Sequence, residues 1–278
     1  MMDFFAMMTL EQFGQIKLIS SAGLLAVFWI WETWHPFFGW QSSGRVRHGL
    51  ANLAIAVMNT LILGLIFGTA TVGVAEWANH HQLGLLNWVP LPGSVQFGMA
   101  LVLSDAWLYA WHRANHTIPL LWRFHRMHHS DTKMDVTTAT RFHLGELSFA
   151  AVLRLGVIIA LGLRIEHTLT YDLLVLASTQ FHHADISLGR LDRWLRGVFV
   201  TPDMHKVHHS REFAETNSNY STILSLWDRL AVSFRMRTEP KTIEFGLEDF
   251  REPDWQTIPG LWKTPFVKRP VPPSDRIK

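Results

Sequence analysis

Long apolar stretches separated by short polar segments dominate the first half of the chain. Residues 50–75 form the clearest stretch, because these 26 residues include no Asp, Glu, Lys, Arg or His. About 20 apolar residues cross a bilayer as a helix, so this stretch spans it with room for tilt. The apolar run 18–31 has only 14 residues, a length that also fits an interfacial or buried helix. Snorkelling by Lys17 and Glu32 would lengthen it.

Three further apolar segments predict helices in the middle of the chain. A break at residues 92–94 precedes the run 95–111, for which Ser94 is the expected helix N-cap. Residues 146–163 and 168–181 are joined by a short polar turn, as in a helical hairpin that enters the membrane and returns. We therefore expect an all-α, integral-membrane helical bundle of about four spanning helices or their equivalents.

Basic residues indicate how this bundle is oriented. Arg45 and Arg47 precede the stretch 50–75, the loop 79–93 has no Lys or Arg, and several basic residues follow the run 95–111. Cytoplasmic loops carry the excess of Lys and Arg, so we expect the region after residue 111 and the C-terminus in the cytoplasm. The N-terminus shows neither the charged region nor the cleavage site of a signal peptide.

Composition narrows the class of protein. The chain has 278 residues, of which 48% are hydrophobic and 17% are charged, and its mean hydropathy is +0.11. A net charge of +2 without a long basic run argues against a nucleic-acid partner. Because the chain has no cysteine, disulfides, thiolate nucleophiles, Cys-ligated zinc and iron–sulfur clusters are excluded within it. Thirteen Trp residues suit a protein with two membrane–water interfaces.

Histidines are concentrated in one region of the chain. Twelve of the sixteen lie between residues 112 and 209. Most of these fall in short clusters, where spacings of three and four residues put imidazoles on one helix face. The clusters are His112 and His116; His125, His128 and His129; His182 and His183; and His205, His208 and His209.

The second and fourth clusters repeat one pattern, namely His, a basic residue, an apolar residue and then His-His-Ser. Residues 125–130 read HRMHHS, and residues 205–210 read HKVHHS. At this histidine content, a single His-x-x-His-His frame is expected about 0.05 times in the chain. Two copies therefore indicate a shared chemical role.

Metal binding is the chemistry that this histidine set favours. Neutral imidazole suits divalent iron, zinc, copper and nickel, and one ion takes about four to six ligands. One imidazole from 182–183 and all those of the other clusters make nine candidates, enough for two ions with open positions. Two metals beside apolar helices fit the oxidation of an unactivated lipid C–H bond, which needs a redox metal. Zinc has no redox chemistry, so it would occupy the site as a substitute without supporting turnover.

Other polar residues are expected around these ligands. Metal-bound histidine donates its other N–H to a carboxylate or carbonyl, and buried ionisable groups in membrane segments are functional by default. The candidate supporting residues are Asp105, His143, Glu146, Asp203 and Asp228. For Asp105 a helix-packing hydrogen bond is the alternative. We interpret five other histidines as structural, namely His35, His48, His80, His81 and His167. We interpret four basic residues as a solvated rim that faces lipid headgroups, namely Arg113, Arg126, Lys206 and Arg211.

Residues 105–229 resemble the fatty acid hydroxylase/sterol desaturase superfamily. The resemblance is carried by the 112–116, 125–129, 181–185 and 201–210 motifs, with similar segments at 216–220 and 226–230. The pattern most similar to the bacterial, alkylglycerol-monooxygenase-like branch is Asp105, Tyr109, His112, Arg113 and His116. We accordingly expect a bacterial inner-membrane protein with its His-rich region in the cytoplasm.

The resemblance implies a helical membrane domain capped by a cytosolic, His-rich, non-haem di-iron site. It implies oxygen-dependent hydroxylation or desaturation of a fatty acyl, alkyl-glycerol, sterol or isoprenoid lipid, with two iron ions and molecular oxygen as co-substrate. Electrons would come from a separate ferredoxin, cytochrome b5-like protein or reductase. The implied catalytic ligands are His112, His116, His125, His128, His129, His183, His205, His208 and His209, with His182 as a further metal candidate.

The expected organisation is a single fatty acid hydroxylase-like domain over residues 1–278. Membrane helices fill mainly 1–104, the catalytic region is 105–230, and 231–278 is a C-terminal tail, whose Pro-rich part from Glu239 onward predicts extended packing or a partly disordered end. Two other classes stay open. A metal transporter or metal-binding protein would line a path through the spans with histidines. A bis-His haem carrier would need histidines on facing spans.

Overall fold

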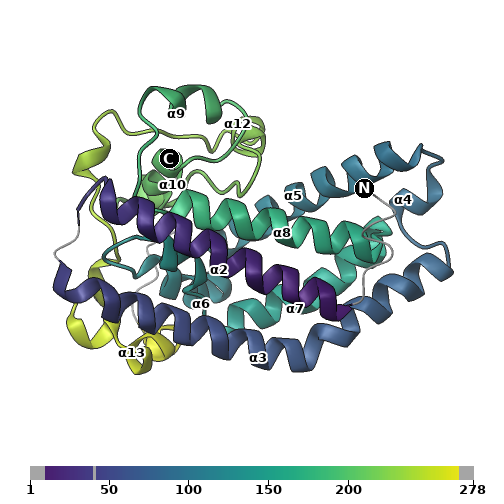
Figure 1. Cartoon of the computed structure of the whole chain (residues 1–278), viewed down its shortest axis with the longest axis horizontal. Coiled ribbons are helices and arrows are strands. Elements are labelled where there is room, and N and C mark those ends of the chain that lie inside the picture. Colours follow the sequence, from purple (N-terminus) through teal and green to yellow (C-terminus); the bar gives the residue numbers. More distant parts are fainter. Residues whose placement is uncertain (1–9, 40–41, 269–278) are drawn as a thin grey trace.

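Long helices packed side by side form the body of the molecule. The structure, a computed structural model, describes residues 10–39 and 42–268. The long helices are α2 (Leu10–Trp34), α3 (Ser42–His80), α5 (Gly93–Thr117), α7 (Leu144–Leu161) and α8 (Ile165–His183), and Figure 1 shows them running along the long axis of the molecule. The short α4 (Leu85–Trp88) lies between α3 and α5 at one end. The described residues form no named strand, only the isolated bridges Phe199–Leu224 and Ser210–Phe245.

Three of the five predicted apolar stretches fall in helices of the described residues that are long and apolar enough to cross a membrane, whereas the runs 95–111 and 168–181 do not. Within the described ranges, three segments are long and apolar enough to cross a membrane: Glu11–Trp34, Gly44–Trp88 and Leu144–Leu161. Many of their large apolar side chains point outward, which is stable only in contact with lipid or a partner. The prediction of an all-α membrane bundle is confirmed. The run 18–31 belongs to a helix of 25 residues, long enough to span without help from snorkelling.

Helices α7 and α8 follow one another across the turn 162–164, but only α7 is a candidate membrane span among the described residues, and glycine ends it. The φ of Gly162 is 69°, a left-handed conformation that ends α7 and that glycine adopts without a steric penalty. A Cβ on Gly84 would lie 2.1 Å from the Gly162 nitrogen, so the loop after α3 and the turn after α7 approach through glycine. The expected N-cap is wrong. Helix α5 begins at Gly93 after Pro92, so Ser94 lies inside the first turn and makes no capping bond.

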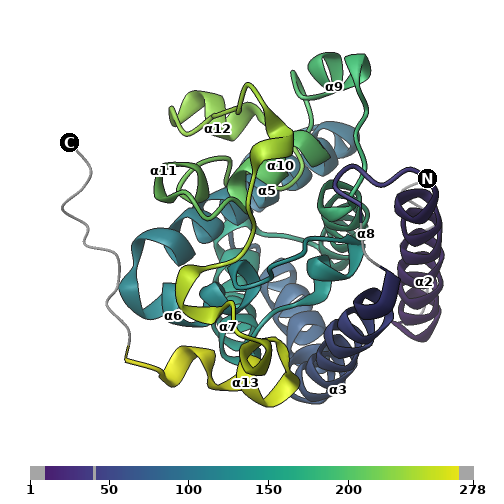
Figure 2. The same cartoon turned by 90° about the vertical axis from the view of Figure 1, so that its left-hand side faces the viewer.

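Short helices gather at the opposite end of the bundle, and Figure 2 views this end directly. They are α6 (Pro119–His129), η1 (Val136–Thr140), α9 (Arg190–Leu195), α10 (Pro202–His208), α11 (Phe213–Thr216) and α12 (Leu226–Leu230). The C-terminal part adds η2 (Pro240–Thr242), η3 (Glu248–Phe250), η4 (Pro253–Gln256), α13 (Ile258–Lys263) and η5 (Thr264–Phe266).

The described part of the C-terminal tail packs onto the bundle, as one of the two alternatives expected, but it does so through short helices rather than as extended chain. Leu261 on α13 is fully buried in a cluster with Ile55 of α3 and Met127 of α6. The tail thus ties a membrane helix to a helix that carries histidine clusters. Residues 269–278 lie outside the described part of the chain.

Candidate metal centre

Nine imidazoles, taken from the residues that the structure describes, meet where α5, α6, α8 and α10 converge. They form two groups, and the nitrogens that each group offers lie within 4.8 Å of one another. The first group is His112, His116, His125, His129 and His208; the second is His128, His183, His205 and His209. The groups adjoin, since the stacked rings of His129 and His209 have centroids 4.5 Å apart.

Each repeated motif divides its histidines between the two groups. The outer histidines of the α6 motif, His125 and His129, join the first group, while His128 joins the second. In the α10 motif the outer pair joins the second group, and His208 joins the first. Positions i and i+4 lie about 40° apart around a helix, and i+3 lies on the other side of i, so one helix supplies both groups.

Hydrogen bonds from the Nδ1 atoms orient four of the rings. Three donate to backbone carbonyls and one donates to a carboxylate, an arrangement that directs Nε2 inward with its lone pair free. The pairs are His112 with Tyr220 O at 2.8 Å, His208 with Ser218 O at 2.6 Å, His183 with Thr179 O at 2.7 Å and His125 with Glu146 Oε1 at 2.8 Å.

The contacts between Nε2 atoms fit a cation. Nε2 of His112 lies 3.1 Å from Nε2 of His208, and both rings already donate their N–H from Nδ1. Two lone pairs cannot form a hydrogen bond, whereas a cation binds both. In the second group, Nε2 of His183 lies 3.2 Å from His128 Nε2 and 3.1 Å from His205 Nε2. Nitrogens at right angles around an ion about 2.1 Å away are about 3.0 Å apart, which matches these separations.

Burial disfavours the charged form of three of these imidazoles. Desolvation lowers the pKa of His128, His129 and His208 well below the usual histidine value, and neighbouring imidazoles lower it further. Within the described residues, neither ring nitrogen of His116 or His129 has a hydrogen-bond partner. A buried polar atom without a partner costs about 1–3 kcal/mol, so the site as built favours a ligand that satisfies many nitrogens at once. Neutral, inward-facing imidazoles are the form that binds divalent metals.

His182 lies beside the two groups rather than in either. Its ring centroid is 3.9 Å from that of His205, and it hydrogen-bonds to the backbone of Thr222. The structure therefore brings His183, and not its neighbour, among the converging nitrogens.

Two of the five expected supporting carboxylates and histidines act on the groups. Glu146 accepts from His125, as described above, and joins α7 to the site. Asp228 acts on the first group indirectly, through the backbone. It accepts from the backbone N–H groups of Tyr220 and Ser221 at 2.8 and 2.9 Å, and so holds the carbonyl that orients His112.

The other three supporting residues lie elsewhere and, within the described ranges, make no hydrogen bond to a grouped histidine. Asp105 accepts from Trp227 Nε1 at 2.8 Å and from Leu224 N at 3.1 Å, so the helix-packing alternative holds. His143 caps α7 by accepting from Gly145 N at 2.9 Å. Asp203 pairs with Lys206 at 3.6 Å.

The interpretation of the basic residues as a solvated rim is wrong for Arg126 and Lys206. They are only 4% and 1% exposed. The Arg126 guanidinium donates to the carbonyls of Thr264 and Val267 at 2.5 and 2.8 Å, and Lys206 donates to the Ile186 carbonyl. Both cations point away from the histidine groups and fasten their helices to other segments.

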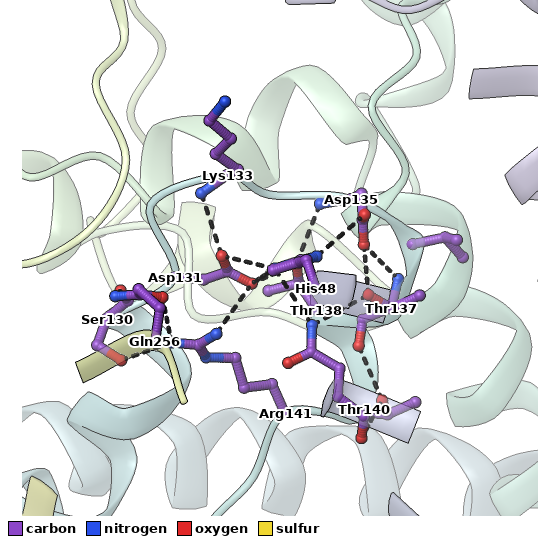
Figure 3. Close-up of polar contacts among 12 residues, drawn as sticks. His48, Ser130, Asp131, Lys133, Asp135, Thr137, Thr138, Thr140, Arg141 and Gln256 are labelled. Carbon is purple, nitrogen blue, oxygen red and sulfur yellow. Dashed lines mark hydrogen bonds and ion pairs between the residues drawn. The ribbon is translucent and has the colours of Figure 1, made fainter. Parts of the chain in front are cut away.

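His48 is a further positioning residue that its isolated place in the sequence did not indicate. Figure 3 shows it among Asp131, Asp135 and Arg141, next to the end of α6. Its Nε2 lies 2.9 Å from the Asp131 carboxylate, and its Nδ1 lies 3.3 Å from Asp135. Burial alone would raise the pKa of Asp131, but His48 and Arg141 hold that pKa below its usual range. The network fixes the chain two residues after His129.

Comparison with known proteins places the chain in a family. The fatty acid hydroxylase model matches residues 97–233, a range that contains both histidine groups. Ornithine lipid hydroxylase OlsE of Rhizobium tropici is 30% identical over 241 residues, which cover 84% of this chain and 70% of that protein. The alkylglycerol monooxygenase of Xenopus tropicalis is 25% identical over 73% of this chain, and cholesterol 25-hydroxylase of Mus musculus is 25% identical over 52%.

Fold and site together define a membrane-embedded helical protein with a multi-histidine centre. The chain belongs to the fatty acid hydroxylase family. The predicted superfamily and its bacterial branch are thereby confirmed. The matched region spans 44% of the Xenopus alkylglycerol monooxygenase and 48% of the mouse cholesterol 25-hydroxylase. No solved structure matches the chain.

Proposed function

We propose that this protein is a non-haem di-iron monooxygenase that uses molecular oxygen to hydroxylate or desaturate a C–H bond of a membrane lipid. The observation that carries the proposal is the pair of adjoining imidazole groups, whose lone pairs converge in a chain of the fatty acid hydroxylase family. Nine imidazoles are too many for one ion and suit two ions with open positions.

Each group would hold one iron ion. Bound iron would supply the redox chemistry with oxygen, which no side chain can perform. The protein's own residues orient and seclude the site. Glu146 and the carbonyls of Thr179, Ser218 and Tyr220 hold four rings in one tautomer, and burial keeps water from the imidazoles.

The surroundings of the site support a lipid as the substrate. Relatives of the chain are named for hydroxylation of ornithine lipid or cholesterol and for oxygenation of alkylglycerols, and all three are amphiphilic lipids. We propose that residues 1–104 mainly anchor the protein, that 105–230 form the catalytic region and that 231–278 are a C-terminal tail. The reducing electrons would come from a separate ferredoxin, cytochrome b5-like protein or reductase. The His-rich end would face the cytoplasm from a bacterial inner membrane.

A metal transporter is disfavoured by where the histidines lie. A transport path needs polar sites along the spans. The three candidate spans carry only His48, His80 and His81, and none of these belongs to a metal-binding group of the described residues. Both groups lie together at one end of the bundle.

Iron content and lipid oxidation, measured on one preparation, test the proposal. The protein would be purified without oxygen, loaded with Fe(II), supplied with a reductant and with oxygen, and assayed on extracted bacterial lipids by mass spectrometry. We expect about two iron ions per chain. We also expect products that have gained an oxygen atom or lost two hydrogens. Zinc-loaded protein is the matched control, since it keeps a metal without redox activity. Failure to retain any iron after anaerobic loading would refute the proposal.

A further inference from the structure

An exposed apolar surface lies on α9, on α12 and on the segments that follow them. Trp194 and Val232 are 79% and 91% exposed. The other exposed apolar side chains of this α9–α12 surface are Leu191, Val198, Phe199, Leu226 and Leu230. Figures 1 and 2 both show α9 and α12 on one side of the molecule, at the end of the bundle where the short helices gather. An apolar patch of this kind marks a contact with a partner or a membrane.

The α9–α12 surface belongs to a fixed framework. The backbone N–H of Ser225 donates to the Val198 carbonyl at 2.9 Å, and an isolated bridge pairs Phe199 with Leu224. Asp105 of α5 then accepts from Leu224 N and from Trp227 Nε1. The apolar side chains are therefore held outward by bonds to the membrane bundle, and they do not collapse onto it.

The exposed charges on this surface have one sign. Arg190, Arg193 and Arg229 are exposed, whereas Asp192 and Asp228 are buried. Asp192 pairs with Arg196 at 2.8 Å, and Asp228 accepts from backbone N–H groups. Arginines beside aromatic and aliphatic side chains, with the acids turned inward, form the pattern that attracts anionic lipid headgroups.

Exposed Trp side chains elsewhere in the chain point to the same environment. Trp34 ends α2 and is 75% exposed, and Trp88 ends the second candidate span and is 68% exposed. Trp collects at the ends of spanning helices because its ring suits the boundary between headgroups and acyl chains. Trp194 is as exposed as these two residues but lies outside every candidate span of the described residues.

We propose that the α9–α12 surface lies in the headgroup region of the same bilayer that holds the spanning helices. The ring of Trp194 and its aliphatic neighbours enter the apolar boundary, and Arg190 and Arg193 contact the phosphates of anionic phospholipids. A bilayer fits better than a protein partner, because the surface is fastened to a bundle that already lies in lipid and its exposed charges are all positive. The inference does not depend on the metal or on the reaction.

Fluorescence from single labels tests this placement. The chain has no cysteine, so a Trp194→Cys variant has one thiol, which would carry an environment-sensitive fluorophore. The labelled protein would be placed in nanodiscs of phosphatidylcholine and phosphatidylglycerol, where both faces are open to water. Leu65→Cys on α3 is the membrane control, and Glu248→Cys on η3 is the aqueous control.

We expect nitroxide-bearing lipids to quench the label at position 194 nearly as strongly as the label at 65. Iodide should quench it about threefold less than the label at 248, because an anion in water does not reach the interface. Equal iodide quenching at 194 and 248 would overturn the proposal. Protection from iodide in native membranes, together with exposure in nanodiscs of lipid alone, would also overturn it and would indicate a protein partner.

A charge reversal tests the phosphate contact separately. Lipid quenching at 194 should increase with the fraction of phosphatidylglycerol, and Arg190→Glu with Arg193→Glu should abolish that increase. The label at position 65 should be insensitive to both changes, which shows that the double variant is folded and inserted. A dependence on phosphatidylglycerol that survives the double reversal would overturn the role of these arginines.

Discussion

The two His-x-x-His-His motifs have the same spacing but lie in different surroundings. The α6 motif ends a helix of 11 residues that begins at Pro119, and the α10 motif lies in a helix of 7 residues capped by Thr201. They nevertheless divide their imidazoles reciprocally, two to one group and one to the other. Spacing within the motif decides how each one is divided, and the surroundings decide how each one is held.

The positions between the histidines serve matching purposes in the two motifs. The apolar residues Met127 and Val207 are both fully buried, the first against α3 and α13 and the second against Met134, Ile243 and Phe245. The basic residues Arg126 and Lys206 both donate to carbonyls of other segments. Each motif therefore presents histidines on one side and anchors on the other.

The largest effect should follow from removing the one histidine of each motif that does not join the same group as the motif's other two histidines. His128→Ala should empty the second group while leaving the first occupied, because His128 belongs to the second group. His208→Ala should empty the first group and leave the second occupied, because His208 belongs to the first. We expect each variant to lose about one iron per chain and to lose activity by about 100-fold or more. Metal analysis by mass spectrometry and the lipid assay measure both effects.

The matched control for these variants is His35→Ala, which removes an exposed histidine outside the groups. It should keep both ions. Full iron content and full activity in both His128→Ala and His208→Ala would contradict the division of the motifs between two ions.

Removing the carboxylate beside the α6 motif should have the next largest effect. His125 donates to Glu146, whereas Nδ1 of its counterpart His205 has no hydrogen-bond partner in the described ranges. Glu146→Ala should weaken iron binding by about 10–100-fold. Glu146→Gln keeps an acceptor oxygen and should recover most of the affinity. Competition with a chelator gives the values, and unchanged affinity in Glu146→Ala would show that His125 needs no carboxylate.

Replacing the basic residue inside each motif, Arg126 or Lys206, should destabilise the protein to different extents. Arg126→Met leaves the carbonyls of Thr264 and Val267 without their donor, a loss of about 2–4 kcal/mol. Lys206→Met frees one carbonyl and also leaves the largely buried Asp203 carboxylate without its cation, so we expect a larger loss of about 3–5 kcal/mol. Inactivation half-lives in detergent measure the order. Arg211→Met is the control, because its ion pair with Glu244 is exposed. A larger loss in Arg126→Met would reverse the comparison.

The residue pattern was sufficient for the long helices and for eight of the nine histidines that converge, whereas His183 in place of His182 was implied only by the family resemblance. Apolar runs locate spanning helices because lipid requires about 20 apolar residues, and spacings of three and four residues place imidazoles on one face. Which histidine joins which group depends on how α6 and α10 cross, and the spacing does not contain that information. The orienting carbonyls of Thr179, Ser218 and Tyr220 were also hidden, because every residue has a carbonyl.

Long-range pairing explains the remaining misses. His48 looked isolated because its partner Asp131 is 83 residues away. Arg126 looked solvated because the carbonyls that it binds lie 138 and 141 residues later, in a tail that was expected to be extended or partly disordered. Asp105 pairs with Trp227 across 122 residues, so its sequence position did not decide between a supporting role and helix packing. In each case the residue type indicated what kind of interaction it could make, but the sequence did not indicate which distant residue is its partner.

The serine that ends each motif gives the smallest and most closely matched contrast. The Ser130 hydroxyl donates to the Met127 carbonyl at 2.7 Å and accepts from Arg141 at 3.0 Å, and it is buried. The Ser210 hydroxyl accepts from Glu212 N at 3.2 Å, a local bond. Ser130→Ala should therefore cost about 1–2 kcal/mol and Ser210→Ala about 0.5 kcal/mol.

Hydrogen exchange at the ends of α6 and α10 would show the difference locally. Faster exchange should follow Ser130→Ala around residues 131–141, where Arg141 loses its acceptor, while Ser210→Ala should leave the segment after α10 nearly unchanged. Losses of equal size would mean that the place of a serine in the motif sets its contribution. A larger loss of stability in Ser130→Ala than in Ser210→Ala would instead mean that the contribution of Ser130 comes from Arg141 and the His48 network. Both lie beside the first motif alone.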